Sequence, residues 1–322
     1  MFDFMGKRKI FFGISLVIIL IGIMATLVNG LVLDIQFEGG SVMRIATEDA
    51  VYTSEEMESF IMETLGKRPS SVQRLTAGGN GGDRDSILLV KFRKTGVLTQ
   101  DESEQLMEAI QDKLSLEEID ASYENVEPFI GRELRDRAIM ASLIAMALIF
   151  FYVAWRFSVM SGVPAAVTAL VALIHDAFVM LAFYAIFRLP INDSFIAAIL
   201  TILGYSINDT IVIYDRVREN SILIRKAHNF ELMNRSIHQS MARSINTVVT
   251  TLITVIVVYL FSSAYNINSL KEFTLPLVVG LLSGTYSTFF IAGPLWAVWK
   301  EASLKRMGTR RGTTRTAGKA KA

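Results

Sequence analysis

The chain has 322 residues, and 52% of them are hydrophobic, in blocks longer than the helices of a soluble core need, so the sequence is typical of a membrane protein. Its formal net charge is only +1, and the positions of the charges therefore say more than their sum. Because the chain has no cysteine, disulfides, thiolate metal sites and a cysteine nucleophile are excluded, whereas the redox compartment stays open.

Six apolar stretches are long enough to span a membrane. The first lies within residues 10–30 and follows Lys7, Arg8 and Lys9. It is longer than the core of a signal peptide and no A-x-A cleavage pattern follows it, so we expect an uncleaved anchor. The other five form a bundle over residues 138–299, at about 138–155, 163–187, 194–214, 246–263 and 273–299. Six spans would put both chain ends on the same side.

Lysine and arginine residues predict the orientation. One arrangement puts on the same side the segments 1–9, 156–162, 216–243 and 300–322, which hold most of the basic residues near the spans. The opposite short loops hold only Arg188 and Lys271. The positive-inside rule therefore makes the first set cytoplasmic and residues 31–134 extracytoplasmic. The basic tail 300–322 is expected to be disordered and attracted to anionic lipid.

Residues 31–134 have the pattern of a separate α+β domain. Two amphipathic helices are predicted, at 54–66 with a capping box from Ser54 and at 99–114. Four strands are predicted, at 41–47, 70–77, 86–92 and about 119–130. The order β-α-β-β-α-β is that of a ferredoxin-like fold. The run GGNGGD (78–83) joins two strands and opens no helix, which favours a hairpin loop over a phosphate-binding loop.

Two pairs of glycines predict close packing. The segment DIQFEGG (34–40) carries Asp34 and Phe37 and ends in Gly39 and Gly40, just beyond an extended run. These glycines would allow a bulge or a close backbone approach, so that a strand leaves the membrane and enters the external sheet; a structural turn is favoured over substrate contact. In the last span, Gly280 and Gly284 have GxxxG spacing, with Ser283 and Ser287 nearby, which predicts close helix packing within the chain or against a partner.

Ionisable residues inside the spans are the candidate functional residues. Asp209 lies in the cytoplasmic half of the fourth span, and Asp176, preceded by His175, lies near the middle of the third. An acid at such a depth costs at least about 2.5 kcal/mol and is a functional candidate by default. One interpretation is that Asn208 and these residues only hold helices together, but serine or asparagine would do so without a charge to bury. Burial favours the neutral form of a carboxyl group, so we expect Asp209 to take up and release protons.

A proton relay also needs a counter-charge. Arg243 stands at the start of the fifth span, at a depth from which it could reach Asp209, and it is equally compatible with an ordinary positive-inside flank. Asp215 and Arg216, at the cytoplasmic end of the fourth span, are interpreted as interface residues. The charged segment 218–238 is predicted to form a surface helix along the cytoplasmic face.

Three motifs carry a family resemblance. They are DIQFEGG at 34–40, the pair His175–Asp176, and above all GYSINDTIVIYDRVREN at 204–220, which includes Gly204 and Asn208 and is followed by RSINTVVTT from Arg243. Together with one span, a large external domain and five further spans, they resemble the SecF branch of the SecD/SecF family of protein-export membrane proteins, in the resistance-nodulation-division superfamily. The segment EPFIGRELRDRA before span two matches the family pattern only loosely, which leaves open how the chain re-enters the membrane.

The resemblance implies a fold and a function. The fold is a membrane α-helical bundle of six transmembrane helices with an extracytoplasmic ferredoxin-like domain between helices 1 and 2. The implied function is not enzymatic: a SecF-like subunit pairs with SecD, attaches to the SecYEG translocon and uses the proton-motive force to promote preprotein export, with YajC and YidC as further partners. By motif position Asp209 and Arg243 carry protons, with Asp176 as a weaker member. No cofactor, metal or nucleic acid is expected.

Two rival functions stay open from the residues alone. An intramembrane aspartyl protease also needs two acids on neighbouring spans, and Tyr214–Asp215 superficially fits. Against it, Asp215 lies beside Arg216 at the membrane edge, and Asn208 stands where that family has glycine. A half-size small-molecule exporter driven by protons would have to form a homodimer, and co-purification of a distinct, similarly built subunit would argue against it.

Overall fold

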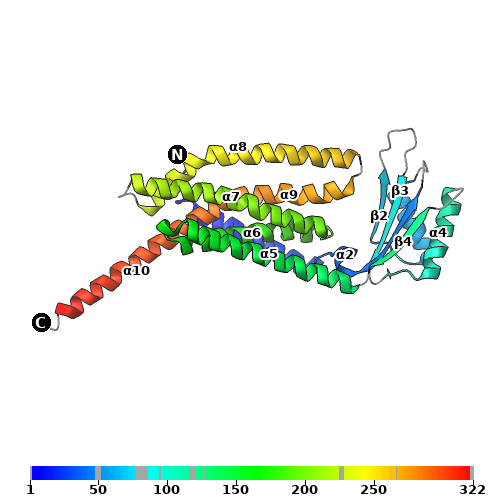
Figure 1. Ribbon diagram of the computed structural model, residues 1–322, viewed down its shortest axis with the longest axis horizontal. Coiled ribbons are helices and arrows are strands. Elements are labelled where there is room, and N and C mark those ends of the chain that lie inside the picture. Colours follow the sequence, from blue (N-terminus) through cyan, green and yellow to red (C-terminus); the bar gives the residue numbers. More distant parts are fainter. Residues whose placement is uncertain are drawn as a thin grey trace.

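The computed structural model describes residues 2–47, 52–76, 86–93, 96–115, 120–126, 128–224, 228–265 and 267–319. Figure 1 shows two parts, a bundle of long helices and a small α/β domain at one end of it. The N-terminus and the C-terminal end of α10 lie at the opposite end, away from the α/β domain (Figure 1).

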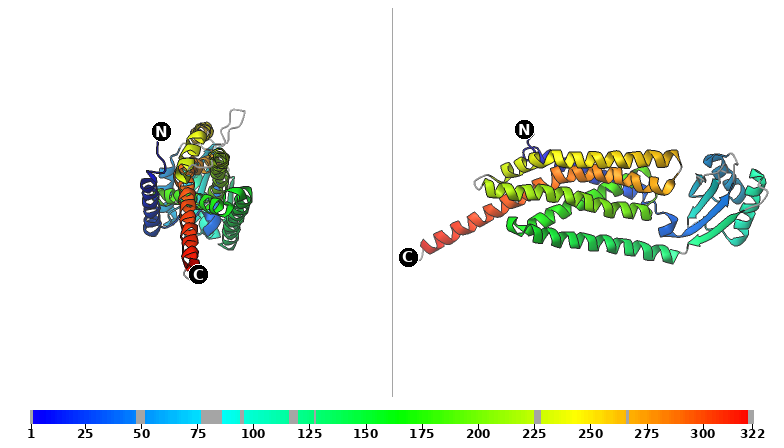
Figure 2. Two further views of the ribbon diagram at one scale, coloured as in Figure 1. Left: turned by 90° about the vertical axis from the view of Figure 1, so that its left-hand side faces the viewer. Right: turned by 45° about the horizontal axis from the view of Figure 1, so that its top comes forward.

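Among the described residues, six helical segments of the bundle are long and apolar enough to cross a membrane, as the sequence predicted. Their observed bounds are α1 Arg8–Asn29, α5 Pro128–Arg156, α6 Gly162–Phe187, α7 Asp193–Leu223, α8 Asn229–Ala264, and α9 Asn268–Ser287, which continues through a π-helical turn at Thr288–Ala292 into α10 Gly293–Lys319. Of these, α6, α7 and α9 are the most buried. Seen end on, α1 and α5 flank the bundle on opposite sides (Figure 2).

Glycines let the central helices approach closely. A Cβ atom at Gly280 would overlap the side chain of Ile202, and one at Gly284 would lie 3.1 Å from the Cβ atom of Ser206. The GxxxG pair of α9 therefore packs against α7, within this chain. Beyond the π-helical turn and Pro294, α10 leaves the bundle at an angle (Figure 1).

The external domain is a split β-α-β fold, as predicted. Its elements are β1 Gly40–Ala46, α3 Ser54–Leu65, β2 Ser71–Thr76, β3 Ser86–Arg93, α4 Gln100–Leu114 and β4 Ala121–Val126. The strand order is β2-β3-β1-β4 and every neighbouring pair is antiparallel. Alternate residues of β1 and β3, such as Met43, Ile45 and Val90, pack against Ile61 of α3 and Ile110 of α4 in one buried core.

The capping box of α3 begins one residue earlier than predicted. The Thr53 hydroxyl accepts from the backbone N–H of Glu56, and the Glu56 carboxylate accepts from the backbone N–H of Thr53. Reciprocal bonding needs Glu or Gln three residues after the cap, and only Thr53 has this spacing, because the residue three after Ser54 is Met57.

Four other segments differ from expectation. Residues 34–40 do not form an extended run, because Asp34 caps a one-turn helix, α2 Ile35–Glu38. The last predicted strand ends at Val126, and Pro128 already opens α5, a position that suits proline. No separate helix occupies 218–238 in the described residues; α7 and α8 extend instead. The tail continues α10 to Lys319, with no proline after Pro294 to stop it. The GGNGGD loop lies outside the described residues.

Candidate functional site

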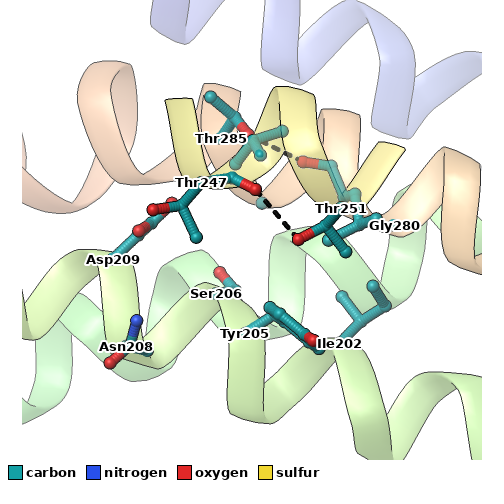
Figure 3. A pocket seen from close by; sticks show the side chains of 12 residues that line it. Ile202, Tyr205, Ser206, Asn208, Asp209, Thr247, Thr251, Gly280 and Thr285 are labelled. Carbon is teal, nitrogen blue, oxygen red and sulfur yellow. Dashed lines mark hydrogen bonds between the residues drawn. The ribbon is translucent and has the colours of Figure 1, made fainter. Parts of the chain in front are cut away.

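Asp209 lies on the side of α7 that faces the neighbouring helices. Only 7% of the residue is exposed. Ser206, one turn earlier on the same face, is also buried, whereas Asn208 lies on an exposed face. Figure 3 shows Asp209 and Ser206 reaching from α7 toward α8 and α9. The buried acid that the sequence singled out is therefore enclosed mainly by helices of its own chain.

Arg243 of α8 is near Asp209 but does not touch it. Its charge acts on the carboxylate, yet no ion pair joins these two described side chains, and Arg243 is exposed. Ser244, the next residue, faces the carboxylate and is buried, but its hydroxyl makes no hydrogen bond of normal geometry in the described part of the chain. Neither side chain therefore makes an ion pair or a hydrogen bond of normal geometry with Asp209 in this structure.

Asp176 of α6 is completely buried and surrounded by donors. Oδ2 accepts from Ser206 Oγ at 2.7 Å and from Ser287 Oγ at 2.8 Å. Oδ1 accepts from Ser283 Oγ at 2.7 Å, and His175 Nδ1 lies 3.2 Å from it. An ionised carboxylate has about four acceptor positions, so in the Nδ1–H tautomer of His175 these donors satisfy it fully.

The three serines around Asp176 are functional candidates that the sequence interpretation missed in this role. Ser283 and Ser287 were noted only for helix packing, although their i, i+4 spacing places both hydroxyls on one face of α9. Ser206 lies three residues before Asp209 and was not singled out. Serine hydroxyls gathered on one face of a membrane helix, in a chain with an intramembrane acid, are the sequence pattern from which they could have been predicted.

A further polar contact extends the network toward α1. The ring of His175 stacks on Tyr286 with centroids 5.9 Å apart, and its buried Nε2 has no partner among the described residues. The Tyr286 hydroxyl donates to the carbonyl of Phe11 at 2.7 Å and accepts from Ser15 Oγ at 3.1 Å. Polar side chains thus run through the bundle from α1 to α7.

A small cavity adjoins Asp209 between α7, α8 and α9. About 10 Å³ of it is open to the centre of a water molecule, roughly the space that one water requires. Its polar lining includes Ser206, Asp209, Thr247, Thr251 and Thr285 (Figure 3). The cavity therefore has the size of a single water, and polar side chains form part of its wall.

Two residues of the most specific motif lie on an outer face of the bundle. Gly204 has open space where a Cβ atom would stand, and Asn208 is exposed. Tyr205 beside them is 45% exposed. Gly204 therefore packs against no described helix of this chain, and Asn208, which also borders the cavity beside Asp209, is partly open to the outside.

The DIQFEGG residues join the external domain to the bundle. Asp34 caps α2 and pairs with Lys91 of β3 at 3.1 Å. Phe37 is buried in a cluster with residues of α6, α7 and α9. Gly39 has φ 82°, which favours glycine, and a Cβ atom at Gly40 would overlap the carbonyl of Phe92, so the close backbone approach that the sequence predicted is present.

Polar bonds also link the loops around this junction. The side chain of Asn192 donates to Glu272 at 2.5 Å, and Asn268 donates to Gln73 of β2 at 3.0 Å. The backbone N–H of Asp34 donates to the carbonyl of Ile191 at 2.9 Å. The external sheet is thereby tied to the ends of α7 and α9.

Asp215, at the other end of α7, is paired within the chain. Arg156 Nη2 lies 3.0 Å and 3.2 Å from its two oxygens, and Arg218 lies 3.1 Å away. The Arg156 pair joins α5 to α7, the Arg218 pair lies within α7, and both engage Asp215 separately from Asp209. Among the described residues, no three His, Asp or Glu side chains are grouped as a metal site would require.

Several proteins similar to this chain are named as subunits of a protein translocase. The family profile described as "Protein export membrane protein SecD/SecF, C-terminal" matches residues 105–302. The protein translocase subunit SecF of Alicyclobacillus acidocaldarius is 34% identical over 308 residues, covering 95% of this chain and 95% of that protein. The subunit SecDF of Bacillus subtilis is 36% identical over 94% of this chain, which spans 39% of that longer protein.

Solved structures agree with the sequence relatives. The crystal structure of SecDF from Thermus thermophilus superposes with a TM-score of 0.74 at 30% identity, covering 93% of this chain and 39% of that one. A second SecDF structure, in the super-membrane-facing form, gives a TM-score of 0.70 at 31% identity and covers 96% of this chain and 40% of that one. The chain is a multi-pass membrane protein that belongs to the SecD/SecF family of protein export membrane proteins.

Proposed function

We propose that this chain is a SecF-type subunit that joins a SecD-type subunit and couples proton movement to protein export at the SecYEG translocon, with YajC and YidC as further partners. The chain is similar to SecF over nearly its full length and spans 39% of the longer SecDF, which supports a protein that supplies one part of a larger unit. The observation that carries proton coupling is Asp209, an acid with 7% exposure inside a membrane helix.

The surroundings of Asp209 suit a group with two charge states. When protonated, the side chain is neutral and burial costs little. After the proton leaves, the carboxylate needs a donor or a positive charge, and Ser244 and Arg243 on α8 can supply both. Because neither is bonded to Asp209 here, ionisation would draw α8 toward α7. Alternation between the two states would give the bundle two packings, which α2 and β1 could transmit to the external domain.

The charge distribution supports both termini being cytoplasmic and the α/β domain being extracytoplasmic. The N-terminus and the start of α10 lie at one end of the bundle, and the α/β domain lies at the other (Figure 1). The first end carries Lys7, Arg8 and Lys9 together with the paired Arg156 and Arg218. We place it at the cytoplasmic face of the bacterial inner membrane by the positive-inside rule.

The exposed face of α7 fits a protein partner better than lipid. Asn208 lies at the depth of Asp209 on this face, and an amide left without partners in hydrocarbon costs several kcal/mol. The adjacent Gly204 would allow a partner helix to approach the backbone of α7 closely. A SecD-type subunit packed here would supply hydrogen-bond partners for Asn208 and enclose the side of the bundle near Asp209.

Export measurements test the proposal. Membrane vesicles that contain the translocon and the SecD-type subunit are given a proton gradient, and the transport of a preprotein is followed. Asp209→Asn keeps size and hydrogen bonding but cannot ionise, so the gradient should no longer stimulate export. Asp215→Asn is the control and should change export much less. Normal gradient-driven export by Asp209→Asn would show that the carboxylate only holds helices together.

Partnership is tested separately by stability in the membrane. Without its partner, the face around Asn208 stays in lipid, so the chain should be degraded faster than when it is co-expressed with the SecD-type subunit. Equal half-lives with and without that subunit would contradict the pairing, and purification as a homodimer would favour the exporter alternative.

A further inference from the structure

Ser206 stands between the two buried acids of the bundle. Its Oγ donates to Asp176 Oδ2 at 2.7 Å. The same side chain lines the cavity that Asp209 lines, and the two residues are one helical turn apart on α7. Of the three serines that bond Asp176, Ser206 alone lines this cavity. It is therefore positioned to connect the surroundings of the two acids.

The cavity can hold the one water that a connection requires. Its 10 Å³ is about the minimum for one water, which needs two to four polar partners. The hydroxyls of Thr247, Thr251 and Thr285 donate to backbone carbonyls of their own helices. Their oxygen lone pairs stay available to accept from a water, while Asp209 and Ser206 complete its bonding.

We propose that Ser206 passes protons between Asp209 and Asp176, which makes Asp176 a second proton site; the proposal rests on the proton-coupled function above. Protonated Asp209 gives its proton to the water in the cavity, and the water gives another of its protons to Ser206 Oγ. Ser206 gives its own hydroxyl proton to Asp176 Oδ2. Asp209 ends as a carboxylate, Asp176 ends as a carboxylic acid, and the water and the serine are restored.

The bonding around Asp176 fits both ends of this transfer. As a carboxylate, Asp176 accepts from Ser206, Ser283 and Ser287. As an acid, it donates from Oδ2 to Ser206 Oγ, whose new hydroxyl proton points into the cavity. The number of hydrogen bonds between Asp176 and the serines is unchanged, so the transfer leaves neither Asp176 nor Ser206 without a partner at either end.

The test measures how fast Asp176 takes up a proton. The full-length chain is placed in lipid bilayers, the pH is lowered rapidly, and the infrared band of the protonated Asp176 carboxyl group, assigned with Asp176→Asn, is followed in time. Ser206→Ala removes only the hydroxyl and should slow proton uptake about 100-fold, the lower end of the effect of a positioned proton-transfer group. Asp209→Asn should slow it to a similar extent.

Ser283→Ala is the matched variant. Ser283 also donates to Asp176 at 2.7 Å and is buried, but it does not line the cavity. Both serine variants remove one bond to Asp176 and should alter its protonation equilibrium alike, whereas only Ser206→Ala should slow proton uptake.

Three outcomes decide the matter. Slow uptake in Ser206→Ala with uptake close to wild type in Ser283→Ala supports the transfer. Equal slowing in both variants, or no slowing in Ser206→Ala, overturns it while leaving Asp209 as the proton carrier. Normal gradient-driven export by Asp209→Asn would instead overturn the proposed function itself.

Discussion

The ion pair between Asp34 and Lys91 fastens the external domain to the bundle, and its removal should loosen that junction measurably. The side chains are only 8% and 16% exposed. Lys91→Met leaves a buried carboxylate without its counter-charge, which costs about 3 kcal/mol at the low end of the usual range. At about 1.4 kcal/mol for each factor of ten, local opening of the junction should become about 100-fold more frequent.

Hydrogen exchange of junction amides measures this opening. The N–H of Asp34 donates to the carbonyl of Ile191, and the N–H of Ile191 donates to the carbonyl of Val32. Both amides should exchange about 100-fold faster in Lys91→Met. Arg44→Met is the control, because Arg44 and Glu124 form an exposed pair worth about 1 kcal/mol or less.

A second substitution separates the lost pair from a general disturbance. Asp34→Asn keeps an N-cap for α2 but removes the charge that Lys91→Met leaves unpaired. The double variant should therefore cost clearly less than the sum of the two single variants. Additive effects, or exchange in Lys91→Met no faster than in Arg44→Met, would refute the role assigned to this pair.

Three further predictions concern the domain and the bundle. Residues 35–132 expressed alone should melt cooperatively, because the sheet and its two helices enclose their own core; a non-cooperative melt in calorimetry would contradict this. Hydrogen bonds from Lys67 and from the backbone N–H of Thr99 hold the pKa of Glu102 below its ordinary 4.5. The stability that these bonds provide should therefore be complete above pH 4.5 and lost as the pH falls below it. Thr99→Ala removes the cap of α4, which costs about 1 kcal/mol, and should lower the melting temperature at neutral pH. Gly280→Leu should force α9 from α7 and reduce the yield of folded protein in detergent, and a wild-type yield would contradict the close packing.

Features set by local sequence could be predicted, because the membrane and the backbone impose strong rules on them. An apolar run of membrane length permits little except a spanning helix. In the external domain, segments with the hydrophobic period of a strand alternate with segments that have the period of a helix, and this order permits few topologies. The capping box of α3 was placed one residue late because Thr53 and Ser54 are both good caps, and only the position of Glu56 distinguishes them.

Features that depend on distant contacts could not be predicted. Asp209 was identified from one helix alone, since any acid at that depth needs an explanation. The bonding of Asp176 joins side chains from α6, α7 and α9, and no pattern within one span specifies which hydroxyls meet it. Whether Asp209 and Arg243 form an ion pair likewise depends on how α7 and α8 pack, and the spacing of residues along the chain does not determine that packing.

Proton flux tests the central claim most directly. Vesicles that contain the full-length chain and a SecD-type subunit, with a pH-sensitive dye inside, are placed in a medium more acidic than their interior. The dye is followed while a preprotein is bound. We expect acidification with the wild-type chain and loss of that signal in Asp209→Asn and Arg243→Met, with Asp215→Asn close to wild type. Acidification by Asp209→Asn at the wild-type rate would show that protons do not pass through this carboxylate.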